Sequence, residues 1–152
     1  HPTTRLVLAW LEGEVRGGET VLDYGCGSGI LAIAAMKLGA ARAVGVDIDP
    51  LALAAARYNA SANAVALDVR GADAALAVNA DLTVANILAN PLRMLAPLLA
   101  SHTRPGGRLA LSGILAAQAD EVMRAYAPFF AMEAAGAEAE WVCLAGTRSQ
   151  AA

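Results

Sequence analysis

Cysteine and histidine are scarce in this chain of 152 residues, which contains two of each. The cysteines, Cys26 and Cys143, stand far apart, and so do His1 and His102. None of these spacings is typical of a metal site, so we expect no metal. A disulfide framework would need more cysteines, and we expect both thiols to be reduced, as in a cytoplasmic protein.

Charged residues are also few, at 16% of the chain, and the formal net charge is −3. The eleven Lys and Arg residues are scattered and form no basic stripe. A protein that binds the phosphates of a nucleic acid directly would carry such a stripe, so we expect no direct contact with nucleic acid. A basic protein remains an acceptable partner.

Long apolar runs are absent as well, although 57% of the residues are hydrophobic. Lys37, Arg42 and Arg57 interrupt the most apolar stretches, and none reaches the ~18 residues that a membrane-spanning helix needs. No basic start leads into an apolar region, so we expect neither a signal peptide nor a membrane partner. The apolar content instead predicts one folded domain with a core on both faces of a sheet.

Helical and strand-like patterns alternate along the chain, which is typical of an α/β doubly wound sheet. We expect helices at about 4–14, 29–38, 50–60, 90–102 and 116–128. Strands are expected at about 20–24, 43–47, 64–69, 82–86 and 107–112, with two more in 131–147. Ligands in such sheets bind beyond the carboxyl ends of the strands, where Tyr24, Asp47, Asp68 or Asp73, and Asn86 are expected.

A glycine-rich turn joins the first strand to the helix that follows it, in VLDYGCGSG at residues 21–29. Glycine lets the backbone bend sharply and approach a ligand closely. A pyrophosphate-binding turn would need a third glycine where Ile30 stands, but that glycine comes one residue early, at Gly29. No Gly-Lys-Ser/Thr follows, which excludes a Walker A loop. The turn therefore suits a nucleoside without a phosphate.

An acid ends the second strand, at Asp47 in AVGVDIDP, 22 positions after Gly25. A carboxylate at this place can accept hydrogen bonds from both ribose hydroxyls. Asp49 precedes Pro50 and a helical run, so we interpret it as a helix N-cap. The Asp47-Ile48-Asp49 sequence also matches the D-x-D of metal-dependent glycosyltransferases, but its position after a glycine turn disfavours that function.

At this point the chain resembles the class I S-adenosylmethionine-dependent methyltransferases, and more specifically the bacterial ribosomal-protein L-eleven methyltransferase family. The first resemblance rests on Asp23, Gly25, Gly27, Gly29 and Asp47. The second rests on four segments: HPTTRLVLAWL at the start, VANILANPL at 84–92, PGGRLALSGIL at 105–115 and WVCLAG at 141–146. The resemblance implies a Rossmann-like, seven-stranded, mostly parallel sheet with an antiparallel last strand and helices on both faces.

The resemblance also implies the site residues and the reaction. S-adenosyl-L-methionine would be bound by Thr4, Asp23, Gly25, Gly27, Gly29, Asp47 and Asn86, with Thr3 as the neighbour most easily confused with Thr4. Asn86 would also be catalytic and would orient the incoming amine. An acid near the end of the third strand, Asp68 or Asp73, would meet the adenine amino group. The substrate would be lysine side-chain and N-terminal amines of a large-subunit ribosomal protein.

Asn86 is followed by Ile87 and Leu88, not by the Pro-Pro-Tyr of enzymes that methylate glutamine side chains or base amines. Taken alone, a polar residue at the end of an apolar strand could also be a local cap before Pro91. Cys26 in the glycine turn has no neighbouring base in sequence, and we interpret it as a small packed residue.

In this family the HPTT run ends a longer segment that follows a separate N-terminal substrate-recognition domain. We therefore expect residues 1–152 to form one S-adenosylmethionine-binding domain, a C-terminal catalytic fragment, with a processed or renumbered chain as the alternative. Two other functions share these motifs: a small-molecule methyltransferase and a non-catalytic nucleoside-binding domain. An oxidoreductase is disfavoured by Ile30.

Overall fold

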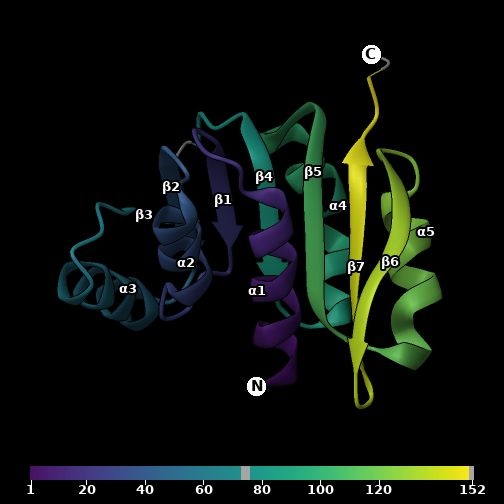
Figure 1. The fold of residues 1–152 in the computed structure, drawn as a ribbon. Helices are drawn as coiled ribbons and strands as arrows, with labels where there is room; N and C mark the ends of the chain where they lie inside the picture. Colours follow the sequence, from purple (N-terminus) through teal and green to yellow (C-terminus); the bar gives the residue numbers. More distant parts are fainter. Residues whose placement is uncertain (73–75, 151–152) are drawn as a thin grey trace.

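The computed structural model describes residues 1–72 and 76–150. Its strands form one seven-stranded sheet in the order β3-β2-β1-β4-β5-β7-β6 (Figure 1). The pairs among β1 to β5 are parallel, and β7 lies antiparallel between β5 and β6. The Rossmann-like fold class that the resemblance implied is confirmed.

The elements follow the alternation of patterns in the sequence. The helices are α1 (Pro2–Glu14), α2 (Ile30–Leu38), α3 (Pro50–Ala62), α4 (Ala89–His102), the short η1 (Ala116–Gln118) and α5 (Ala119–Tyr126). The strands are β1 (Thr20–Tyr24), β2 (Arg42–Asp47), β3 (Asp68–Gly71), β4 (Ala80–Asn86), β5 (Thr103–Leu115), β6 (Phe130–Glu138) and β7 (Trp141–Arg148).

Two expected strands differ from the structure by more than two residues at an end. The third strand was expected at 64–69, but β3 starts only at Asp68, because the chain turns after α3 with Ala64 in the left-handed region at φ +55°. The fifth strand was expected at 107–112 but spans Thr103–Leu115, because pairing with β4 begins at Thr103 and pairing with β7 continues to Leu115. The first of these differences moves a candidate site residue.

Helices cover both faces of the sheet, with α1 and α2 on one face and α4 and α5 on the other (Figure 1). Side chains of β5 alternate between the faces: Leu109 and Leu111 pack in the cluster around α4 and α5, and Ala110 packs in the cluster below α1. The small Ala110 side chain suits the close approach of α1 to the centre of the sheet. This approach brings the first turn of α1 to the carboxyl ends of β4 and β5.

Candidate active site

The glycine turn is fastened to the end of β2 by its backbone. The amides of Gly25 and Cys26 both donate to the carbonyl oxygen of Val46, at 2.7 and 2.9 Å. Gly25, Gly27 and Gly29 all have positive φ, at 77°, 53° and 84°. A Cβ on Gly25 would lie 2.7 Å from the Ile87 side chain, so the turn depends on a residue without one.

Asp47 holds this turn from the end of β2. Its Oδ2 accepts from the amide of Gly27 at 2.9 Å, and its Oδ1 accepts from the amide of Asp49 at 3.0 Å. Each carboxylate oxygen can accept a second hydrogen bond. Asp47 therefore orders the turn and keeps acceptor capacity for a ligand with two neighbouring hydroxyls. Asp49 is the N-cap of α3, as predicted, and accepts from Leu51 at 2.9 Å.

Asp23 lies behind the turn, in the core. Its side chain is buried, and its Oδ2 accepts from the amide of Ala32 in the first turn of α2 at 3.2 Å. The N-cap position of α2 is Gly29, which has no side chain to cap the helix; the carboxylate of Asp23 takes over part of that role. Burial raises the pKa of the neighbouring Cys26 thiol to about 12, so this cysteine stays protonated and unreactive.

Asn86 is the last residue of β4 and contacts the start of α1. Its Nδ2 donates to the Oγ1 of Thr4 at 3.3 Å, across 82 positions of sequence. With the amide nitrogen committed to Thr4, the Oδ1 of Asn86 is left as an acceptor. The pairing between β4 and β5 places Ser112 beside Asn86.

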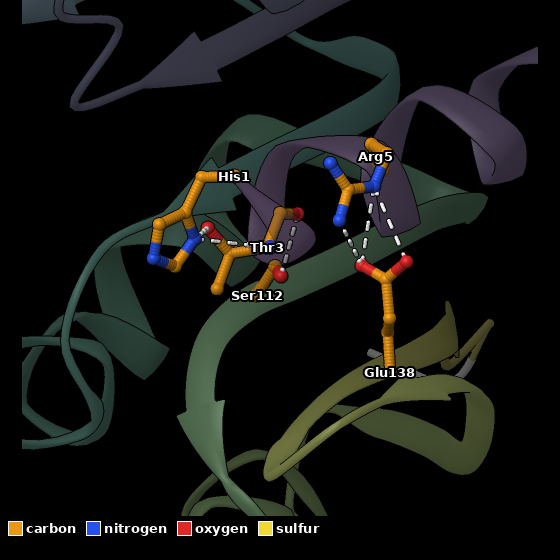
Figure 2. A network of polar contacts seen from close by, with 5 residues as sticks. All are labelled: His1, Thr3, Arg5, Ser112 and Glu138. Carbon is orange, nitrogen blue, oxygen red and sulfur yellow. Dashed lines mark hydrogen bonds and ion pairs between the residues drawn. The ribbon is translucent and has the colours of Figure 1, made fainter.

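The first turn of α1 is tied to the sheet by further polar contacts (Figure 2). Ser112 donates from Oγ to the carbonyl oxygen of Thr3 at 2.9 Å, in a buried position. The guanidinium of Arg5 forms an ion pair with Glu138 at the end of β6, at 2.9 Å. His1 Nδ1 lies 2.9 Å from Thr3 Oγ1, and the His1 ring meets Trp141 edge to face at 5.5 Å.

A cavity of about 850 Å³ opens where these groups meet, at the carboxyl ends of β1, β2 and β4. Of the predicted ligand residues, Gly25, Asp47 and Asn86 line it. Thr3 also lines it, whereas Thr4 contacts Asn86 and is not among the described lining residues. Asp23, Gly27 and Gly29 support the turn and are not among its lining residues in the described part of the chain. The other lining residues are His1, Tyr24, Ile48, Ile87, Leu88, Pro91, Met94, Leu95, Gly113 and Trp141.

Comparison with known proteins assigns the chain to a family. A family model described as ribosomal protein L11 methyltransferase (PrmA) matches residues 1–149. The chain belongs to this family. The resemblance inferred from the motifs is thereby confirmed.

Individual members of the family are closely similar to this chain. A ribosomal protein L11 methyltransferase from Cupriavidus metallidurans is 57% identical over 151 residues, which cover 99% of this chain and 50% of that protein. The chain thus spans about half the length of the curated relatives it matches. A crystal structure of the ribosomal protein L11 methylase from Lactobacillus delbrueckii subsp. bulgaricus is 37% identical, with a TM-score of 0.88 over 97% of this chain and 79% of that chain.

More distant structures share the fold alone. An RNA methyltransferase from Salinibacter ruber, solved with S-adenosyl-L-homocysteine, has a TM-score of 0.78 at 23% identity and covers 100% of this chain and 96% of its own. In the described residues of this L11 methyltransferase family member, no helix is long and apolar enough to cross a membrane. Residues 1–72 and 76–150 also contain no group of three or more His, Cys, Asp or Glu side chains arranged to hold a metal ion.

The structure places Asp68, one of the two candidates for the adenine-contacting acid, away from the cavity. Because β3 begins at this residue, Asp68 lies at the amino end of the strand. The cavity lies at the opposite, carboxyl ends of the strands. Its carboxylate is also held by Arg42 and Arg70, at 3.0 and 2.9 Å. These guanidinium groups lower its pKa. Asp73 lies outside the described residues.

Several lining residues were not predicted from the sequence, among them Trp141, Met94 and Gly113. A tryptophan at the start of a predicted strand and a methionine in a predicted helix are ordinary core residues by pattern. Gly113 carried a usable signal, because a glycine inside a strand often marks a bulge or a close backbone contact. The pairing of β5 with β7 is indeed irregular between Leu111 and Ile114.

We expect Gly113→Ala to destabilise the protein strongly. Gly113 has φ +87°, and an added Cβ would lie 2.1 Å from the carbonyl oxygen of Ile87. The left-handed strain and the forced movement of backbone together cost about 2–5 kcal/mol. Urea denaturation measures the free energy of unfolding, with Gly13→Ala as the control. Gly13 lies in α1 with nothing within 4 Å of its Cβ position, so Gly13→Ala should not destabilise the protein. A Gly113→Ala variant as stable as Gly13→Ala would contradict the argument.

The buried carboxyl of Asp23 predicts a specific dependence of stability on pH. Burial raises its pKa from the ordinary value of 3.8 to about 7, although the amide of Ala32 acts in the opposite direction. The folded state therefore holds an extra proton between about pH 4 and pH 7. This contribution to stability is complete below pH 4 and is lost as the pH rises to about 7.

Asp23→Asn stays neutral and should remove this dependence. Relative to the variant, the wild-type protein should lose about 2–3 kcal/mol of unfolding free energy between pH 5 and pH 7. Urea denaturation of both proteins at several pH values measures the difference. Profiles that run parallel over this range would show that Asp23 is already ionised at pH 5.

Proposed function

We propose that this chain binds S-adenosyl-L-methionine in the cavity and transfers methyl groups to lysine side-chain and N-terminal amines of a large-subunit ribosomal protein, L11, in the cytoplasm. The observation that carries the proposal is the placement of Asn86. Its amide nitrogen is committed to Thr4, and the residue lines the same cavity as the glycine turn and Asp47. An acceptor oxygen is thus available beside a nucleoside-type turn.

The residues present fit the cofactor. Gly25 lacks the Cβ that would fill the cavity wall beside Ile87, and Asp47 offers both oxygens to the ribose hydroxyls. The exposed apolar side chain of Ile48 follows Asp47 and suits an adenine face. Thr3 would meet the methionine part, and Thr4 would do so only after a change of its contact with Asn86. When bound, the cofactor supplies a methyl group that its sulfonium has already activated.

The protein must then deliver a neutral amine in line with that methyl group. A lysine with a pKa of about 10.4 is about 3.4 units from neutrality at pH 7, which corresponds to about 4.6 kcal/mol. The apolar side chains of Ile87, Leu88 and Pro91 line the cavity, and desolvation by such groups lowers the pKa of an amine. The Oδ1 of Asn86 would accept an N–H of the amine and orient its lone pair, which is worth several kcal/mol as positioning.

A dedicated base is not needed in this scheme. The ionisable side chains among the described lining residues are His1, Tyr24 and Asp47. The Nδ1 of His1 accepts from the Thr3 amide, and the remaining acceptor positions of Asp47 would be taken by the ribose hydroxyls. The proton leaves to water before the amine enters the apolar part of the cavity, so the amine arrives as a neutral nucleophile.

Isothermal titration with S-adenosylmethionine tests cofactor binding by this chain, and no heat of binding would refute the proposal. The substrate is tested with the protein extended by the half that its relatives carry, which we propose is a substrate-recognition domain. We expect a methyl mass shift on purified L11. Transfer to small amines or acids with none to L11 would instead favour a small-molecule methyltransferase, and cofactor binding without any transfer a non-catalytic domain.

A further inference from the structure

The first turn of α1 forms a wall of the cavity. It lies at the start of the sequence, whereas the strands that hold it come from the second half of the chain. Thr3 lines the cavity, and Thr4 contacts Asn86. The distance of this turn from the glycine turn and Asn86 is therefore set by whatever fastens α1 to the sheet. The fastening contacts join α1 to β4 through Asn86, and to β5 and β6 through Ser112 and Glu138 (Figure 2).

These contacts differ in strength because they differ in burial. The Arg5–Glu138 pair is exposed, with side-chain exposures of 61% and 41%, and such pairs contribute little. The hydrogen bond from Ser112 to the Thr3 carbonyl is buried, and Ser112 is 0% exposed. Water does not replace a buried hydrogen bond that is lost, so its removal costs more than that of an exposed contact. Ser112 is thus the firmest of these attachments.

Ser112 contacts the first turn of α1, which forms one wall of the cavity, and lies beside the Asn86–Ile87 segment, which forms another. It is the register partner of Asn86 on the neighbouring strand. The next residue, Gly113, lies against the backbone of Ile87, which follows Asn86. Alternation along β5 places Ser112 on the same face as Ala110, below α1, where its hydroxyl donates to Thr3. The pairing of β5 with β7 is irregular directly after it, where Gly113 lies against the backbone of Ile87.

We propose that Ser112 is a positioning residue: its hydroxyl fixes the first turn of α1 so that Thr3 and Thr4 are held in register with Asn86. Ser112 is not among the described residues that line the cavity, so it acts through α1 and not by touching a ligand. The proposal rests on the assignment of this cavity to S-adenosylmethionine. It predicts that loss of the hydroxyl loosens the turn and weakens cofactor binding, with only a modest loss of overall stability.

The test compares Ser112→Ala with Thr83→Val. Thr83 is equally buried on β4 and shares a hydrogen bond of 2.7 Å with Thr103, and neither threonine is among the described lining residues. Both variants lose one buried hydroxyl, so both should lower the melting temperature. Only Ser112→Ala should weaken S-adenosylmethionine binding, by about tenfold, measured by titration at a temperature where all three proteins are folded.

Hydrogen exchange of the free proteins gives a second readout that needs no cofactor. Amides in residues 3–8 should exchange faster in Ser112→Ala than in the wild type or in Thr83→Val, and by more than the other amides of the chain. Binding within about twofold of the wild type, or exchange in residues 3–8 that matches Thr83→Val, would overturn the proposal. A wild-type protein that does not bind S-adenosylmethionine would refute the proposed function instead, and the exchange experiment would still decide whether Ser112 holds α1.

Discussion

Asp47→Ala is expected to weaken the binding of S-adenosylmethionine by at least about 100-fold. The substitution removes the acceptors proposed for the two ribose hydroxyls, and hydrogen bonds to a charged group contribute about 1.5–3 kcal/mol each. It also releases the amides of Gly27 and Asp49, which the carboxylate holds at 2.9 and 3.0 Å in the free protein. The turn therefore loses order in addition to the direct contacts.

Asp49→Ala is the matched control for this prediction. Asp49 is exposed two positions away and caps α3 by accepting from Leu51. Its loss should cost about 1 kcal/mol of stability and leave cofactor binding unchanged. Titration calorimetry measures both affinities. If Asp47→Ala binds within about threefold of the wild type, Asp47 does not bind the ribose, and the cofactor assignment loses its main support.

The parts of the site that are local in sequence could be predicted from it. The turn at Gly25–Gly29 and the acid Asp47 are recognised because a strand, a glycine turn, a helix and a second strand follow one another along the chain. The N-cap at Asp49 was predicted for the same reason, because a cap and its helix are adjacent residues. The antiparallel last strand came from family resemblance and is confirmed by β7, which lies antiparallel between β5 and β6.

The parts that depend on contacts between distant residues could not be predicted. Asn86 was a candidate, but its partner Thr4 lies 82 positions away, and Ser112 contacts Thr3 across 109 positions. The hydrophobic periodicity of these segments does not indicate which distant residues they contact. Whether Thr3 or Thr4 lines the cavity depends on the rotation of α1 about its axis, which is set by packing on β4, β5 and β7. Asp68 was misplaced because strand ends are poorly marked where a helix runs into a turn such as that at Ala64.

Asn86→Ala is expected to separate binding from catalysis. The variant keeps Asp47 and the glycine turn, so its affinity for S-adenosylmethionine should stay within about threefold of the wild type. Methyl transfer to L11 should fall by about 10²–10³ in kcat, because the amine loses the acceptor that orients its lone pair and misplaced reactants react far more slowly. The comparison uses the protein extended by the half that its relatives carry.

Asn90→Ala provides the control for Asn86→Ala, since it removes an exposed asparagine of α4 that contacts Arg93. We expect this variant to transfer methyl groups at the wild-type rate.

Two outcomes of the Asn86 experiment would each change the mechanism. An unchanged kcat would show that the apolar cavity orients the amine without Asn86. The kcat could instead fall together with a tenfold or larger loss of cofactor affinity in titration calorimetry. That result would show that Asn86 acts mainly by holding Thr4 and the first turn of α1. In that case Thr4→Val should reproduce the loss, because it removes the same hydrogen bond from the other side.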